Sequence, residues 1–127
     1  MKNTKFYICP HCGNIVEMVK DAGPKPFCCG QKMNELVPGS IDASAEKHIP
    51  DVKVEEGVVE VNVGSVDHPM VDVHWIEWVQ LVTNKGSYRK WLNPGEAPNV
   101  TFLLGGEKAL EVYAYCNLHG LWKTELN

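Results

Sequence analysis

Apolar and polar residues alternate along most of the chain, and this alternation predicts β-strands from about residue 41 onward. Two short runs, Val52-Lys53-Val54 and Val58–Val63, flank Glu55-Glu56-Gly57, which is typical of a hairpin turn. A longer run over residues 71–83 predicts one strand. Its alternate residues should share one face: Val73, Trp75, Val79 and Leu81.

Further strands are predicted at 88–92, 99–104, 110–116 and 120–125, separated by turns rich in glycine, asparagine and proline. Seven or so short strands at this spacing indicate an antiparallel β-sandwich. Only residues 42–47 favour a helix, of one or two turns.

Residues 1–38 form a separate segment with the pattern of a small unit built around a metal. Apolar runs at 6–8 and 15–19 surround Cys9 and Cys12, and a turn at 22–26 leads the chain back to Cys28 and Cys29. So few residues rarely form a stable core without a metal, disulfides or a partner. Zinc-finger peptides gain about 10–16 kcal/mol of apparent free energy from their metal, so a bound metal would decide whether this segment folds. The predicted domains are 1–38 and 39–127.

The composition is that of a soluble globular protein: 127 residues, 44% hydrophobic and 22% charged, with a formal net charge of −4. An acidic chain without a basic cluster is not expected to bind nucleic acid. No apolar run reaches the length of a signal peptide or a membrane span. We therefore expect a cytoplasmic protein, in which clustered cysteines more often bind metal than form disulfides.

The four N-terminal cysteines predict a four-thiolate site, which suits zinc or a single iron. Zinc ribbons usually present two separated C-x-x-C pairs, whereas Cys28 and Cys29 are adjacent and would reach one metal from an extended chain. The resulting distortion would change the electronic state of an iron, so the spacing favours iron over zinc. Cys9-Pro10-His11-Cys12 is also the sequence of an oxidising thiol–disulfide motif, but no thioredoxin-like βαβ pattern surrounds it. His11 is then expected to face solvent.

A second group of candidate ligands is spread over the sandwich: His48, His68, His74, Cys116 and His119. Each alone could be an ordinary surface or core residue. Together they offer five ligands, so an octahedral iron would keep one position open for a substrate. A blue-copper site also uses a late cysteine and histidine on a β-sandwich, but no methionine follows His119 and two histidines would be left over. Two such sites on one chain suggest redox catalysis.

Along essentially its whole length the chain resembles the two-iron desulfoferrodoxin type of superoxide reductase. The matching stretches are Cys9-Pro10-His11-Cys12-Gly13-Asn14-Ile15-Val16-Glu17, Cys28-Cys29-Gly30, Glu46-Lys47-His48-Ile49-Pro50, Gly64-Ser65-Val66-Asp67-His68-Pro69-Met70, His74-Trp75-Ile76-Glu77-Trp78 and Tyr115-Cys116-Asn117-Leu118-His119-Gly120. The resemblance implies an all-β fold: a small desulforedoxin-like domain followed by an immunoglobulin-like antiparallel β-sandwich, usually as a homodimer.

The same resemblance implies two iron ions per chain. Cys9, Cys12, Cys28 and Cys29 would bind one; the other would have His48, His68, His74 and His119 as equatorial ligands and Cys116 as the axial ligand. The implied reaction is the one-electron reduction of superoxide to hydrogen peroxide, without release of dioxygen. A rubredoxin or a similar small protein would supply the electron.

Two charged residues beside His48 are implied to take part in catalysis. Lys47 is the basic residue next to a ligand, and a cation about 6 Å from superoxide is worth about 1–3 kcal/mol. Glu46 matches the family glutamate that occupies the sixth position of the ferric ion. Two other functions are considered: a rubredoxin-like electron carrier whose second metal site is inert, and a zinc-stabilised β-sandwich binding module.

Overall fold

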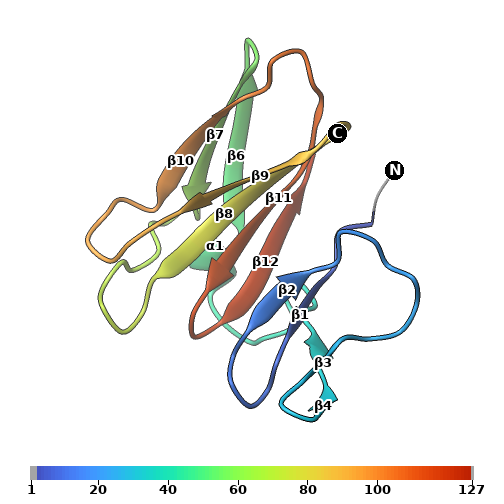
Figure 1. The fold of residues 1–127 in the computed structure, drawn as a ribbon. Helices are drawn as coiled ribbons and strands as arrows, with labels where there is room; N and C mark the ends of the chain where they lie inside the picture. The colour runs from blue at the N-terminus through green and yellow to red at the C-terminus, as the bar shows by residue number, and fades with distance from the viewer. Residues whose placement is uncertain (1–2, 127) are drawn as a thin grey trace. The chain divides into compact units, whose positions relative to one another are not determined.

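The computed structural model describes residues 3–126 and divides the chain into two compact units, Met1–Val37 and Pro38–Asn127. Almost all of the regular structure is antiparallel strand (Figure 1), which confirms the predicted all-β fold class. Within the described residues, the only helix is α1 (Ala45–His48). None of this part of the chain forms a helix that is long and apolar enough to cross a membrane.

The first unit is a small sheet with an attached hairpin. Strand β1 (Phe6–Ile8) pairs with β2 (Ile15–Glu17) on one side and with β5 (Asn34–Glu35) on the other. The hairpin consists of β3 (Phe27–Cys28) and β4 (Gln31–Lys32). Among the described residues of this unit, one buried cluster consists of Tyr7, Cys9 and Met33, and Phe6 is buried as well, so one of its few core residues is itself a candidate metal ligand.

The second unit is an immunoglobulin-like sandwich of two antiparallel sheets. One sheet has the order β10 (Asn99–Leu103), β7 (Val58–Val63), β6 (Pro50–Glu55). The other has the order β12 (Gly120–Glu125), β11 (Ala109–Cys116), β8 (Ile76–Thr83), β9 (Ser87–Trp91).

Side chains from both sheets meet in one hydrophobic core. On β7, Val59, Val61 and Val63 point inward with the two-residue period of a strand. They pack in one cluster with residues of β8 and β11, and this cluster includes the fully buried Cys116 at the end of β11. The core therefore ends at a candidate metal ligand.

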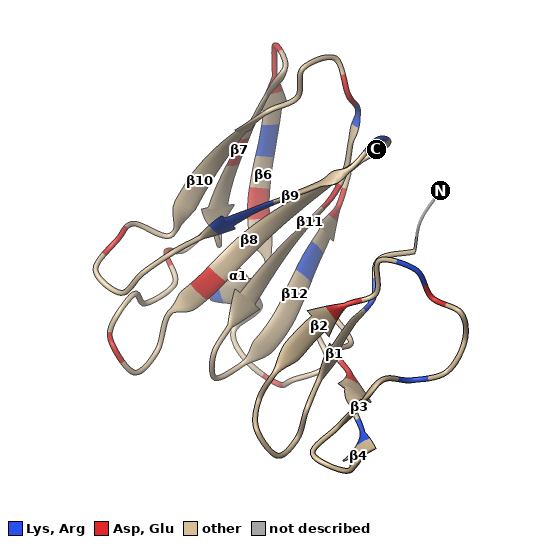
Figure 2. Cartoon of the chain, viewed as in Figure 1, with Lys and Arg blue, Asp and Glu red and all other residues tan. Residues whose placement is uncertain are grey.

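Strand β9 forms one edge of the four-stranded sheet and is exposed along its whole length. It carries Arg89 and Lys90, which appear as a basic stretch in Figure 2. Charged side chains on an edge strand discourage pairing with a strand of another chain, so these two residues protect the exposed edge of the sheet from such pairing.

The prediction of a single strand over residues 71–83 is wrong in its first part. The strand begins at Ile76, and Val71 and His74 instead form a tight turn in which each backbone N–H donates to the other residue's carbonyl oxygen at 3.0 Å. Val73 is 75% exposed, whereas Val79 and Leu81 are fully buried. The alternation of the sequence continues across this point, but the strand begins only after the turn, and its first residues carry a register irregularity between Ile76 and Trp78.

Candidate metal centres

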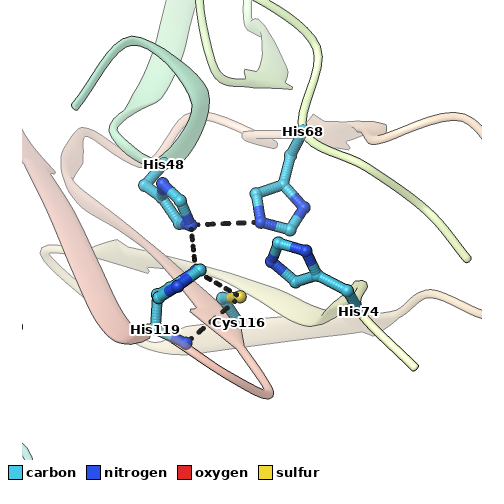
Figure 3. Close-up of side chains that lie close together, drawn as sticks. All are labelled: His48, His68, His74, Cys116 and His119. Atoms are coloured by element: carbon cyan, nitrogen blue, oxygen red, sulfur yellow. Dashed lines mark hydrogen bonds between the residues drawn. The ribbon is translucent and has the colours of Figure 1, made fainter. Parts of the chain in front are cut away.

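The structure brings the five predicted ligands of the second group together at one end of the sandwich (Figure 3). His48 comes from α1, His68 and His74 from the segment before β8, Cys116 from the end of β11, and His119 from the turn between β11 and β12. One potential ligand atom of each residue lies within 4.8 Å of the others. These five side chains are called the histidine–cysteine group below.

The four imidazoles of this group stand at the corners of a near-square. Neighbouring ring centroids are 4.6 Å apart for His48–His68 and His68–His74, 5.0 Å for His74–His119 and 4.9 Å for His119–His48. Across one diagonal, His48 and His74 are 6.4 Å apart. The Cys116 sulfur lies 3.8 Å from Nδ1 of His119, so a thiolate joins the four imidazoles as a fifth potential ligand.

The nitrogen positions fit a metal ion better than a hydrogen-bonded cluster. Nδ1–H of His48 donates to the carbonyl oxygen of Ser44 at 2.6 Å, and Nδ1–H of His68 donates to that of Pro69 at 2.6 Å. A neutral imidazole has a single N–H, so Nε2 of both rings is a bare acceptor. These two acceptors face each other at 3.2 Å, where only a cation could satisfy both.

Distances and unsatisfied atoms agree with this conclusion. Metal–nitrogen bonds of about 2.1 Å place adjacent ligands about 3.0 Å apart. Nε2 of His48 lies 3.2 Å from Nε2 of His68 and 3.1 Å from Nδ1 of His119. Nε2 of His74 is buried without any hydrogen-bond partner. The residues present therefore fit a bound metal.

Burial favours the neutral form of three imidazoles of the group. It lowers the pKa of His68 to about 4 and lowers the pKa of His48 and His74 as well. Neutral imidazole is the form that binds metal. Burial raises the pKa of the Cys116 thiol, while backbone N–H groups of Leu118 and His119 act in the opposite direction. The N–H of His119 lies 3.4 Å from this sulfur, so the site already supplies a donor for a thiolate.

Trp122 on β12 supports two of the ligands. Its indole Nε1–H donates to the carbonyl oxygen of His119 at 3.0 Å, and its ring packs against His48 with centroids 5.0 Å apart. Trp78 on β8 instead stacks on Tyr115, the neighbour of Cys116, at 5.6 Å.

Glu46 and Lys47 lie on α1, directly before His48, and both are exposed. The backbone of this turn is held in place: the carbonyl oxygen of Glu46 accepts from the N–H of Val66 at 2.9 Å and from the hydroxyl of Ser65 at 3.3 Å. The side chains themselves remain free to reach solvent. Burial, then the neighbouring imidazoles and last the charge of Lys47 lower the pKa of His48 and His74.

The four predicted cysteine ligands form the second group, with their sulfur atoms within 4.8 Å of one another. Sγ of Cys12 is 3.5 Å from Sγ of Cys28, which is 3.9 Å from Sγ of Cys29. Tetrahedral coordination with metal–sulfur bonds of about 2.3 Å gives sulfur separations of about 3.8 Å. The Cys12 N–H donates to Sγ of Cys9 and, as the largest cause, lowers the pKa of that thiol to about 6. This group therefore also fits a metal.

The adjacent cysteines reach one point through a turn. Cys28 ends β3, but Cys29 has a left-handed backbone with φ of 53° and is followed by Gly30 at 76°. The expected extended chain is thus wrong at Cys29, because a left-handed residue turns its side chain back toward that of its neighbour. His11 is exposed, as predicted, and belongs to neither group among the described residues.

Comparison with known protein families supports a metal site at each of the two groups. The chain matches the family model for desulfoferrodoxin over residues 40–125 and the model for the desulfoferrodoxin N-terminal domain over residues 2–36. The chain belongs to the desulfoferrodoxin family. In this family context, the four-cysteine and histidine–cysteine groups fit two iron sites.

Individual desulfoferrodoxins and related structures extend the likeness over nearly the whole chain. A desulfoferrodoxin from Nitratidesulfovibrio vulgaris is 45% identical over 121 residues, covering 95% of both chains. The crystal structure of the superoxide reductase from Treponema pallidum is 39% identical, with a TM-score of 0.81, and covers 98% of this chain and 100% of that chain. A superoxide reductase from Giardia intestinalis aligns with 65% of this chain and 98% of that chain, at 29% identity and a TM-score of 0.56.

Some residues that support the histidine–cysteine group are not predicted from the sequence. Ser44 and Pro69 hold imidazoles through backbone carbonyls, which any residue type could provide, so their sequence carries no signal. Asn117 does carry a signal in the sequence, because it lies inside the Cys116–His119 loop, and an asparagine in a loop commonly makes side-chain hydrogen bonds to the backbone.

Proposed function

We propose that this chain is a superoxide reductase that reduces superoxide to hydrogen peroxide at an iron held by the histidine–cysteine group. The balanced reaction joins one superoxide anion, one electron and two protons to give one hydrogen peroxide. The observation that supports it most directly is the square of four imidazoles with a single thiolate beside it. A metal that binds six ligands in an octahedron would have one position left for a substrate after these five.

Iron in this group would supply the ferrous–ferric couple that provides the electron. The protein residues determine the charge, the access of water and the ligand orientation around that couple. Four neutral imidazoles add no charge, so the Cys116 thiolate would be the one anionic side chain among the five. Its complete burial keeps water from the sulfur. The carbonyl groups of Ser44 and Pro69 fix the rings of His48 and His68, so these rings need not reorient during turnover.

Lys47 would attract the anionic substrate to the open position. It directly precedes His48 on α1 and is exposed, so it is a positive charge in solvent beside a predicted ligand. An attraction of about 1–3 kcal/mol corresponds to about a fivefold to hundredfold gain in capture rate, at 1.36 kcal/mol per decade. Glu46, in the same turn, is the carboxylate we propose for the sixth position of the ferric site, because a hard anionic oxygen favours the ferric ion.

The four-cysteine group would hold a second iron that stores or passes electrons. We further propose that a small electron-transfer protein such as rubredoxin supplies them, and that the protein acts as a cytoplasmic homodimer. These proposals rest on the resemblance to the family. Sedimentation of the iron-loaded protein tests the dimer, and reduction by purified rubredoxin tests the donor.

The central test is stopped-flow mixing of the reduced, iron-loaded protein with superoxide. A superoxide reductase should react near the diffusion limit and yield hydrogen peroxide without dioxygen. An electron carrier with an inert second site would show no rapid reaction. A zinc-stabilised binding module would be colourless and contain no iron, so metal analysis and the optical spectrum separate it from both.

A further inference from the structure

Asn117 links two of the loops that carry ligands. It lies between Cys116 and His119 in the turn that joins β11 to β12. Its side-chain Oδ1 accepts from the backbone N–H of Trp75 at 3.0 Å, and its Nδ2 donates to the carbonyl oxygen of Val73 at 3.0 Å. Its own backbone N–H donates to the carbonyl oxygen of Trp75 at 3.3 Å. All three hydrogen bonds fall on the residues that flank His74.

His74 needs this support more than the other early ligands. The rings of His48 and His68 are fixed by their own hydrogen bonds to carbonyl oxygens, whereas no hydrogen bond to the His74 ring is found in residues 3–126. The turn that carries His74 is also poorly packed: Val71 is 53% exposed and Val73 75% exposed. The position of this ring therefore depends on its backbone.

We propose that Asn117 is a positioning residue that places His74 relative to Cys116 and His119. An asparagine amide offers one acceptor and one donor side by side, so it can bond the backbone on both sides of a residue as a neighbouring strand would. Through it, three of the five ligands become one connected structure. The proposal rests on the proposed function only in taking iron as the metal.

Loss of such support around a metal ligand typically costs 10–100-fold in metal affinity. In Asn117→Ala both side-chain bonds are lost, and the His74 turn keeps only its own two hydrogen bonds and the longer backbone bond from residue 117 to the carbonyl oxygen of Trp75. We expect ferrous iron to bind the histidine–cysteine group about 10–100-fold more weakly than in the unmodified protein. In the oxidised protein, the absorption band of thiolate-bound ferric iron should shift or broaden, because one imidazole is no longer held in place.

The experiment is a titration of the iron-free full-length chain with ferrous iron against a competing chelator, followed by the optical spectrum after oxidation. Asn84→Ala is the matched control: Asn84 also bonds the backbone through its side chain, accepting from the N–H of Lys108 at 2.8 Å, but it follows the opposite end of β8. Iron in the four-cysteine group serves as an internal reference, since it should bind equally in every variant.

A second variant covers the case in which Asn117→Ala does not fold. Asn117→Asp keeps the size of the side chain and an acceptor for Trp75, but it sets an oxygen against the carbonyl of Val73. It should weaken iron binding and change the spectrum in the same direction. The proposal would be overturned if the variant that folds binds iron within twofold of the unmodified protein and has an unchanged spectrum. If the unmodified protein binds iron in this group but does not reduce superoxide, while the variants still lose affinity, the proposed function fails and the role of Asn117 stands.

Discussion

Gly64 lies where the chain leaving β7 meets the turn that carries Glu46, Lys47 and His48. A Cβ atom at residue 64 would come within 2.7 Å of the carbonyl oxygens of Glu46 and Ile49, and within 3.2 Å of the carbonyl carbon of Lys47. All of these are backbone atoms, which cannot rotate away as a side chain can. The substitution Gly64→Ala must therefore displace the turn that holds the first imidazole ligand.

The size of the effect follows from these contacts. Ordinary contacts to a Cβ begin at 3.4 Å, so the two carbonyl oxygens must retreat by about 0.7 Å from 2.7 Å. Overpacking of this kind typically costs about 1–3 kcal/mol in the free energy of unfolding. For a domain of this size, each kcal/mol lowers the melting temperature by about 4–8 °C. The shift also exceeds the tolerance of about 0.5 Å for a metal site, so iron binding through His48 should weaken too.

Thermal unfolding of the iron-free protein measures the first effect, and iron titration measures the second. Gly86→Ala is a suitable control, because the atoms nearest to a Cβ at residue 86 belong to the Tyr88 side chain, at 3.3 Å and beyond, and not to the backbone. We expect the control to unfold within a few degrees of the unmodified protein. A Gly64→Ala protein that matches the unmodified one in both melting temperature and iron affinity would refute the reasoning.

Four further predictions concern the two metal groups. Lys47→Ala should slow the reaction with superoxide about fivefold to hundredfold and flatten its dependence on ionic strength, whereas an unchanged stopped-flow rate would remove Lys47 from the mechanism. Glu46→Ala should leave that rate nearly intact but alter the absorption of the resting ferric protein; an identical spectrum would show that the carboxylate does not reach the iron. Burial lowers the pKa of His68 to about 4 from 6.5, so the unfolded chain binds more protons between these values. Urea unfolding of the iron-free protein should therefore show stability falling as the pH drops from about 6.5 to 4, by on the order of 3 kcal/mol from this group, and His68→Asn should flatten the curve. Removal of metal from the four-cysteine group should unfold the first unit, because its buried cluster is so small; hydrogen exchange would detect this, and persistent protection of β1 amides would contradict it.

Much of the sandwich could be predicted because its strands alternate with a period of two. The predicted strands at 58–63 and 120–125 coincide with β7 and β12, and those at 99–104 and 110–116 differ from β10 and β11 by one residue at one end. The candidate ligands could also be predicted from the sequence, because cysteine and histidine are rare and chemically distinct. All nine lie in the two groups that the sequence predicted.

The remaining features depend on contacts between distant parts of the chain. Periodicity could not show that residues 71–74 close on themselves, because alternating valines look alike in a strand and in an exposed turn. The bonds from Asn117 join residues 42 and 44 positions apart in the sequence. The proximity of Gly64 to Glu46 is likewise a product of the folded structure. No local pattern encodes such juxtapositions.

The hydrogen bonds at His48 and His68 have a consequence for protein engineering. Each ring donates a hydrogen bond to a carbonyl oxygen no more than four residues away. A short peptide, rather than the whole protein, therefore determines which ring nitrogen carries the hydrogen and which is left to bind a metal. A pentapeptide spanning residues 44–48, transplanted as a helical turn into an unrelated scaffold, should bring its protonation pattern with it. Designers of artificial metalloenzymes could then treat such segments as interchangeable parts.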